Sequence, residues 1–425
     1  MIKTVVLPKS PSAAPPPVHV SNRTYPRTLD LMAAGLVGLL LSLPYATWRF
    51  APGVLVIDLL EVLLIFVALA IQLTKPVPRV ALAAWVFLGL LFLVHIALAT
   101  VQLPLRDALL QGRWFLPLIA GSVLMAARLR VCRHNAVCLI AITTSFSAII
   151  ATLAHYLGPD VVVALAGDIP QTEVVESTAR MYWFSATAAL CVPVVLCTRA
   201  NPTFAWTTVV ICGVGVALTM SRTLIAAYVV VFVAGVLLSR SLKALALTAS
   251  VLLGAVAGMY FVFERGPLSE KALNTAVTRF TPSEEEADRA LFVGRVPLYE
   301  QYQERLSETG GFGQGLGRPV ATINGTDGFT TDISLLSMWI PFGLPGVVAL
   351  ILVLASTFQL TLRESNVALR SHLLVLLLVG CAASVNYDLW TRNNFVVAVA
   401  FIAASRDRGT DSASVEQDPT FYRRS

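Results

Sequence analysis

Charged residues are scarce in this chain of 425 residues. They make up 13% of it, whereas hydrophobic residues make up 56%, and the mean hydropathy is +0.74. Soluble globular proteins carry about 25% charged residues. So few charged side chains cannot cover the water-facing surface of a fold of this size, which excludes most cytosolic enzymes and disordered scaffolds. The composition suits a lipid bilayer, and we expect an integral membrane protein.

Several chemical motifs are missing. The six cysteines form no Cys-x-x-Cys pair, so we expect them to be packing residues rather than zinc ligands or disulfide partners. Without a Walker loop, ATP is not expected to drive the protein, and without an Asp-x-Asp pair no metal-bound nucleotide sugar is expected. The sequence therefore predicts no metal and no cofactor. The net charge of +6 does not predict a nucleic-acid partner, because the basic residues lie between apolar runs.

Long apolar runs are abundant. A spanning helix needs about 20 apolar residues, and apolar runs recur at 29–48, 53–73, 80–101, 114–129, 135–157, 182–198, 204–220, 223–238, 244–263, 331–358, 373–389 and 394–404. We therefore predict an all-α, polytopic bundle of about 12 transmembrane helices. The predicted divisions are a basic, Pro-rich tail at 1–28, helices 1–9 at 29–263, a large extracytoplasmic loop at 264–330, helices 10–12 at 331–404 and a tail at 405–425.

The basic residues predict the orientation. With the N-terminus inside, the cytoplasmic segments hold 18 Lys and Arg residues and the short outer segments hold 6. The long loop is left out of this comparison because long loops cross the membrane regardless of charge. Both termini are therefore predicted to be cytoplasmic, and the 264–330 loop to lie on the opposite side. The outer basic residues are all arginines: Arg49, Arg106, Arg113, Arg180, Arg222 and Arg392.

Three local strings resemble the O-antigen polymerase/ligase family. The first is Met-Ser-Arg-Thr at 220–223, between two apolar runs. The second is Gly294-Arg295, followed by the glycine-rich string Gly-Phe-Gly-Gln-Gly-Leu-Gly at 311–317. The third is Thr-Asp-Ile-Ser at 331–334, followed by Phe-Gly-Leu-Pro-Gly at 342–346. The layout is similar too, since the largest loop comes late, before the last three predicted spans.

The resemblance implies an inner-membrane glycosyltransferase that joins glycans carried on undecaprenyl pyrophosphate. Its partners would be these lipid-linked glycans, membrane lipids, a chain-length regulator and a flippase. The ligase branch of the family carries a His-Asn pair where this chain has Asp332 and Ile333, and none of the five histidines lies in the long loop. This difference favours the polymerase branch, with ligation to lipid A core as the alternative.

Asp332 is the predicted catalytic residue. It lies where the long loop is expected to re-enter the membrane, and partial desolvation there would let it accept a proton from an attacking sugar hydroxyl. An aspartate next to a threonine at a helix start is also typical of a helix N-cap. The two roles are compatible.

Five arginines are the predicted pyrophosphate ligands, because a guanidinium fork pairs with phosphate oxygens. For Arg222 the alternative is a plain turn, and for Arg113, in Gly-Arg-Trp, it is interface anchoring. Arg180 borders a predicted aromatic belt, and Arg318 follows the glycine-rich string. Arg295 begins an amphipathic stretch over 295–308 that could lie on the bilayer, and its alternative is an ion pair with the acidic run before it.

Two carboxylates fall inside a predicted span. Asp58 and Glu61 share one helix face at i, i+3, and a carboxylate there should face a polar or protein cavity. A structural polar pair and a substrate role are both compatible with the pattern. A lipid or solute transporter is the alternative function from another class, and it would need charged residues near the middle of several spans. Only these two qualify.

Overall fold

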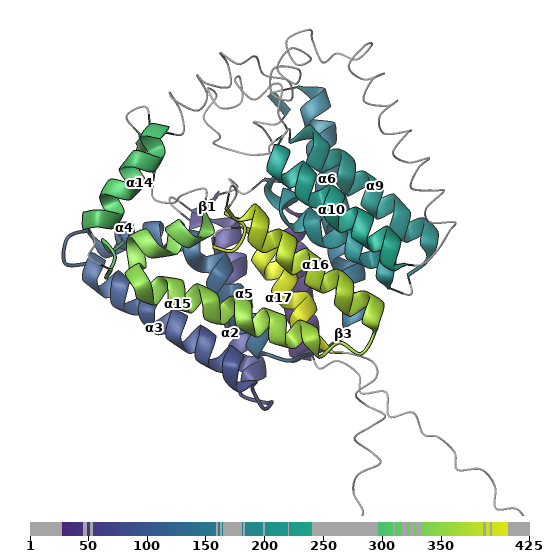
Figure 1. Ribbon diagram of the computed structural model, residues 1–425, viewed down its shortest axis with the longest axis horizontal. Coiled ribbons are helices and arrows are strands. Elements are labelled where there is room, and N and C mark those ends of the chain that lie inside the picture. The colour runs from purple at the N-terminus through teal and green to yellow at the C-terminus, as the bar shows by residue number, and fades with distance from the viewer. Residues whose placement is uncertain are drawn as a thin grey trace, which may run out of the picture.

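The computed structural model describes residues 28–45, 49–51, 54–158, 160–161, 164, 181, 183–198, 200–219, 221–239, 296–308, 311–316, 321–323, 326–328, 333–385, 388–391 and 393–406. These residues are mostly helical (Figure 1). The longer helices are α1 (Thr28–Ser42), α2 (Val56–Gln72), α3 (Arg79–Ala99), α6 (Arg133–Leu157), α9 (Pro202–Leu218), α10 (Arg222–Leu238), α14 (Val296–Glu308), α15 (Ser334–Leu362) and α16 (Val367–Ala383). The shorter ones are α4 (Leu105–Gly112), η1 (Arg113–Phe115), α5 (Leu116–Ala126), η3 (Phe184–Ala186), η4 (Ala188–Cys197) and α17 (Asn394–Ala404).

Short strands join some of these helices. The described strands form three pairs. Two pairs are antiparallel hairpins: β1 (Arg49–Ala51) pairs with β2 (Val54–Leu55), and β4 (Ala321–Ile323) pairs with β5 (Thr326–Gly328). The third pair is parallel and joins β3 (Leu129–Cys132) to β6 (Ser405–Arg406), which lie far apart in the sequence. The strands serve as connections, since the core is built by helices.

The protein is a helical membrane protein. Within the described residues, four helical stretches are long and apolar enough to cross a membrane: Arg79–Ala99, Leu105–Ala126, Arg133–Leu157 and Ser334–Leu362. Large apolar side chains such as Phe66, Leu93 and Phe146 lie exposed on the outside of the bundle. An apolar surface of this extent is stable in contact with lipid but not with water.

Each predicted apolar run coincides with a helical segment, except 244–263, which lies outside the described residues. The helices begin and end within a few residues of most predicted runs, but α5 is preceded by α4 and η1, so the helical stretch there begins earlier than predicted. The amphipathic stretch predicted over 295–308 is the helix α14, whose Tyr302 packs against Ile340 of α15. The total of 12 spans stays a prediction.

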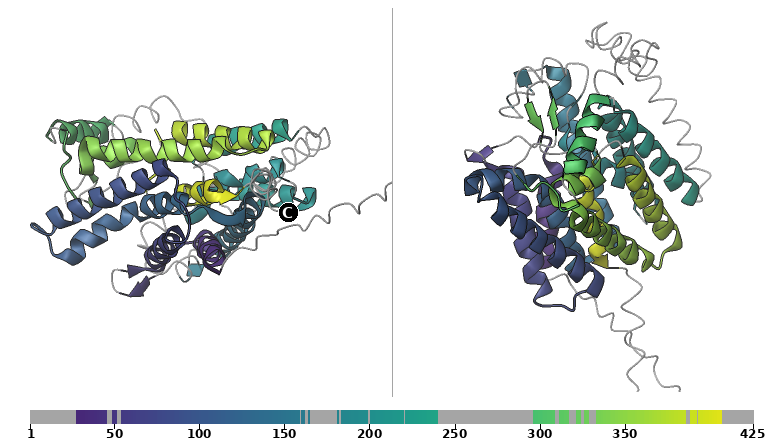
Figure 2. Two further views of the ribbon diagram at one scale, coloured as in Figure 1. Left: turned by 90° about the horizontal axis from the view of Figure 1, so that it is seen from below. Right: turned by 60° about the vertical axis from the view of Figure 1, so that its left-hand side comes forward.

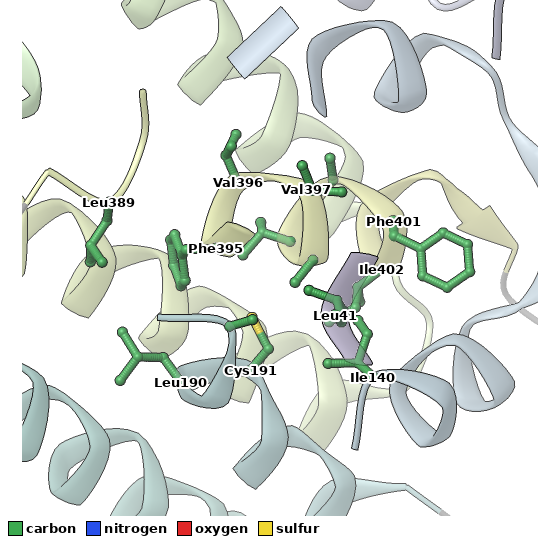
Figure 3. Packing of buried hydrophobic residues seen from close by; sticks show 14 of the residues in the cluster. Leu41, Ile140, Leu190, Cys191, Leu389, Phe395, Val396, Val397, Phe401 and Ile402 are labelled. Atoms are coloured by element: carbon green, nitrogen blue, oxygen red, sulfur yellow. The ribbon is translucent and has the colours of Figure 1, made fainter. Parts of the chain in front are cut away.

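The short helix α17 occupies the centre of the bundle. All of its residues are buried, and it packs mainly against α5 and η4, with α1, α6 and α15 around it (Figures 1 and 2). Around Phe395, Phe401 and Ile402 of α17, the core contains Leu41 and Cys191 (Figure 3). Cys212 is buried as well. The packing role predicted for the cysteines therefore holds for these two.

One end of the bundle, called here the β3–β6 end, is held by buried ion pairs. Arg133 donates to the Glu364 carboxylate and to the carbonyl oxygens of Ile402 and Ser405, both at 3.0 Å. In a second pair, the Lys75 ammonium lies 2.6 Å from the Asp30 carboxylate. The Lys75 contact joins the end of α2 to the start of α1. The Arg133 contacts join the start of α6 to the ends of α15 and α17, since a basic side chain at a helix C-terminus satisfies carbonyls that the helix leaves free.

Candidate functional site

The opposite end of the bundle, called here the glycine-loop end, is organised around a break in α15. Gly343 lies inside this helix with φ 67° and ψ −156°, which are not helical. Two prolines, Pro341 and Pro345, flank the break. Pro345 has no N–H, so the carbonyl of Pro341, four residues earlier, is left without its helical donor. A break of this kind is tolerated in a membrane only where other groups satisfy the freed backbone.

The glycine loop, residues 311–316, supplies those groups. The Gln314 N–H donates to the Ile340 carbonyl at 2.8 Å, and the Gly315 N–H donates to the Pro341 carbonyl at 3.0 Å. In return, the Leu344 N–H donates to the Gly311 carbonyl at 2.8 Å. The loop thus replaces the hydrogen bonds that the proline and the break remove from the helix, and it is fixed to α15 through its backbone.

Only glycine fits at the contact between loop and helix. A Cβ on Gly343 would come within 2.3 Å of the Gly311 oxygen, and a Cβ on Gly313 would come within 2.5 Å of the Pro341 oxygen. Both glycines also have positive φ, at 67° and 79°. Any side chain would therefore both collide with backbone and strain its own conformation. Two of the three strings behind the family resemblance meet at this contact.

Phe342, next to the break, connects it to two other helical segments. Its ring packs edge-on against His95 of α3, with centroids 4.9 Å apart, and against Phe115 of η1, at 4.8 Å. His95 is buried, and its Nδ1 has no hydrogen-bond partner. The glycine loop, α3 and η1 therefore form one continuous cluster.

Arg113 opens η1, two residues before Phe115. Its guanidinium carbon lies 5.0 Å from the centre of the Trp114 ring, and its Nε is buried without a hydrogen-bond partner. The preceding residue, Gly112, packs closely against α3, since a Cβ there would come within 2.8 Å of the Phe92 ring. An arginine held in this way has donors left for a ligand.

The two membrane carboxylates, Asp58 and Glu61, lie one turn apart on α2. The Arg113 charge stabilises the ionised form of Asp58. The Asp58 carboxylate also accepts the Leu55 N–H at 3.0 Å, and this hydrogen bond caps α2. Glu61, one turn further, is 2% exposed, and its Oε1 has no partner. The polar-pair interpretation therefore accounts for Asp58, whereas the free oxygen of Glu61 has no structural role in view.

Another buried carboxylate, that of Asp388, links the start of α15 to the segment just before α17. Asp388 accepts the Ser334 hydroxyl at 2.7 Å, the Thr391 N–H at 3.2 Å and the Thr391 hydroxyl. Beside it, Asn394 is fully buried, and neither of its amide atoms has a hydrogen-bond partner. The bonds of Asp388 fix the first residue of α15, whereas the Asn394 amide is left available.

Two of the six predicted site residues lie within the described part of the chain, and the structure does not bring them together. Arg222 is exposed at the start of α10, where the Ser221 hydroxyl accepts the Leu224 N–H at 3.4 Å. Its helix packs mainly against α16, η4 and α9, whereas Arg113 sits between α4 and α5, on the other side of the bundle (Figure 1). The predicted residues Asp332, Arg180, Arg295 and Arg318 lie outside the described residues.

Sequence reasoning missed His95, Asn394 and the meeting of loop and helix. A histidine within an apolar run is an available signal, because an ionisable residue inside a span usually has a partner or a function. Asn394 gave a weaker signal, since an asparagine at a helix start is usually a cap. Pro345 predicts a broken helix, but the segment that fills the break cannot be identified from the chain alone.

The glycine-loop end combines an arginine with free donors, carboxylates and a backbone break within an apolar bundle. This set can hold an anion and accept a proton close to the membrane surface. No known protein family and no curated protein matches this chain.

Proposed function

We propose that this protein is a membrane-embedded glycosyltransferase that transfers a growing glycan from undecaprenyl pyrophosphate onto a lipid-linked repeat unit. The observation that carries the proposal is the contact between the glycine loop and the break in α15. This contact joins two strings, 311–316 and 342–346, that resemble the polymerase/ligase family and are separate in the sequence. The packing of Phe342 against Phe115, two residues after Arg113, supports a shared site.

In this reaction a hydroxyl of the acceptor sugar attacks the anomeric carbon of the donor glycan. The new glycosidic bond forms as the bond from that carbon to the pyrophosphate oxygen breaks. The hydroxyl proton passes to a carboxylate, for which Asp332 is our candidate, and the lipid pyrophosphate leaves with its negative charge. The energy comes from the donor bond, so neither ATP nor a metal is required by the proposal.

Arg113 is the described residue best placed to stabilise the departing pyrophosphate. The Trp114 ring orients its guanidinium, and its Nε–H is not engaged by another protein group; preorganised charge of this kind often contributes more to catalysis than any other effect. Arg222, Arg180, Arg295 and Arg318 remain candidates from the sequence. Asp388 is proposed as a positioning residue, because its hydrogen bonds fix the start of α15, two residues after Asp332.

Purified protein incubated with an undecaprenyl-pyrophosphate-linked repeat unit tests the proposal directly. We expect a ladder of longer lipid-linked products in the wild type, elongation lowered about 10²–10³-fold in Arg113→Gln, and no ladder in Asp332→Asn. Arg106→Gln is the matched control, since Arg106 lies exposed on α4 just before Arg113. A ladder that persists unchanged in both site variants contradicts the site. Transfer to lipid A core instead of elongation identifies a ligase.

A transporter is the second candidate, and the break in α15 is the observation that favours it. Transporters use interrupted helices to bind substrate near the middle of the membrane, and the free Glu61 oxygen adds a buried ionisable group. Proteoliposomes that take up a lipid-linked glycan or solute, without elongating it, would support this alternative and exclude the polymerase.

A further inference from the structure

Basic side chains from separate elements converge at the β3–β6 end. The parallel pairing places Leu129 opposite Ser405 and Cys132 opposite Arg406, so Arg128 and Arg130 lie beside the end of α17. The ion pair between Arg133 and Glu364 places the end of α15 at this end of the bundle, and Arg363 directly precedes Glu364. These contacts gather four arginines from three separate segments of the chain: Arg128, Arg130, Arg363 and Arg406.

The acids described at this end are already engaged. Asp30 binds Lys75 and the Arg130 N–H, and Glu364 binds Arg133 and the Asn366 N–H. Both acids are buried beneath the arginines. Desolvation lowers the pKa of Arg128, and the charges of Arg363 and Arg406 lower it further. Like charges held this close repel one another, and an anion bound among them lowers that repulsion.

Two local features indicate that the cluster is built for a ligand. The Nε of Arg130 is buried without a hydrogen-bond partner. Arg128 has a φ of 45°, and it is the only non-glycine residue with positive φ in the described part of the chain. A strained conformation that glycine would adopt freely is retained here by an arginine, which indicates that the side chain is needed.

We propose that the cluster of Arg128, Arg130, Arg363 and Arg406 binds the phosphate group of an anionic membrane lipid. The cluster lies at the end of a lipid-exposed helical bundle, where headgroups meet protein, and guanidinium forks pair with phosphate oxygens bidentately. The preference of basic residues for one side of a membrane accounts for arginines in separate loops. It does not account for their convergence on one folded element.

Native mass spectrometry of the purified full chain, released from detergent with added lipid, tests this proposal. The three probes are phosphatidylglycerol, phosphatidylcholine and inorganic phosphate. The test variants are Arg128→Gly, which keeps the backbone conformation while removing the charge, and Arg363→Gln. Arg79→Gln is the control, because Arg79 is an exposed arginine at the start of α3, outside the cluster.

We expect the wild type and Arg79→Gln to retain phosphatidylglycerol in preference to phosphatidylcholine. Each cluster variant should weaken phosphatidylglycerol binding about fivefold, and the double variant about 25-fold. Equal retention by the double variant and the wild type overturns the proposal. If inorganic phosphate saturates the cluster at the same concentration at which it displaces phosphatidylglycerol, the ligand is a soluble phosphate and the lipid assignment is overturned. Glycan elongation is scored separately, so its absence leaves this result intact.

Discussion

The buried ion pairs of the β3–β6 end contrast with two unpaired polar side chains, Glu61 and Asn394, at the glycine-loop end. At the β3–β6 end, Arg133, Glu364 and Asp30 have partners within hydrogen-bond reach. At the glycine-loop end, Glu61 and Asn394 are as deeply buried but keep polar atoms unpaired. An unpaired buried polar group costs about 1–3 kcal/mol. The comparison indicates that the first end stabilises the fold, whereas the second tolerates a loss of stability where a ligand could bind.

Breaking the buried pair at the β3–β6 end should give the largest effect on stability. Arg133→Ala leaves the Glu364 carboxylate buried without its partner, which typically costs about 3–5 kcal/mol. We expect a large fall in the melting temperature of the detergent-solubilised protein. Arg133→Met combined with Glu364→Leu removes both charges and should recover much of the loss. A melting temperature unchanged by Arg133→Ala would contradict the structural role of this end.

Arg113 tests the opposite end through activity. Removing one preorganised donor to a developing anion typically costs about 10²–10³-fold in rate, so we expect Arg113→Gln to lower glycan elongation by that factor. Its melting temperature should stay close to that of wild type, because the side chain is only half-buried. If Arg113→Gln lowers the melting temperature as much as Arg133→Ala does, Arg113 has a structural role and the contrast between the two ends is wrong.

Gly343→Ala tests whether the glycine loop and α15 form one unit. The backbone conformation of Gly343 is one that essentially only glycine adopts, so an alanine there costs about 1–3 kcal/mol, and the collision with the Gly311 carbonyl adds about 1–3 kcal/mol. We expect a lower melting temperature together with easier proteolysis of the glycine loop. Gly89→Ala in α3 is the control, since a Cβ there meets nothing within 4 Å, and it should lower neither the melting temperature nor the resistance of the glycine loop to proteolysis.

Asn394→Val should give the smallest effect, and in the opposite direction. The valine side chain has no polar atoms to leave unpaired. We therefore expect the free energy of unfolding to stay the same or to rise by about 1 kcal/mol at most. If Asn394 belongs to the site, elongation falls while stability does not. A clear loss of stability would show that the amide has a structural partner and would weaken the contrast between the ends.

The helices could be predicted from the sequence because each apolar run contains its own signal. The pair of Arg133 and Glu364 could not, since the two residues are more than two hundred positions apart and each resembles an ordinary loop charge. For the same reason, the sequence grouped Arg113 with Arg222 by their predicted membrane side, whereas the fold separates them across the bundle. Residue type predicted the chemistry available, and packing decided which residues meet.

The position of α17 has a consequence for synthesis. This helix has 11 residues and, at 1.5 Å per residue, spans only about half of the hydrocarbon thickness. It is also the last helix to leave the ribosome among those described, although α5 and η4 depend on it for their packing. The helices made earlier therefore lack their packing partner until residues 394–404 have been synthesised. A premature stop before Asn394 would leave the whole assembly without its central helix.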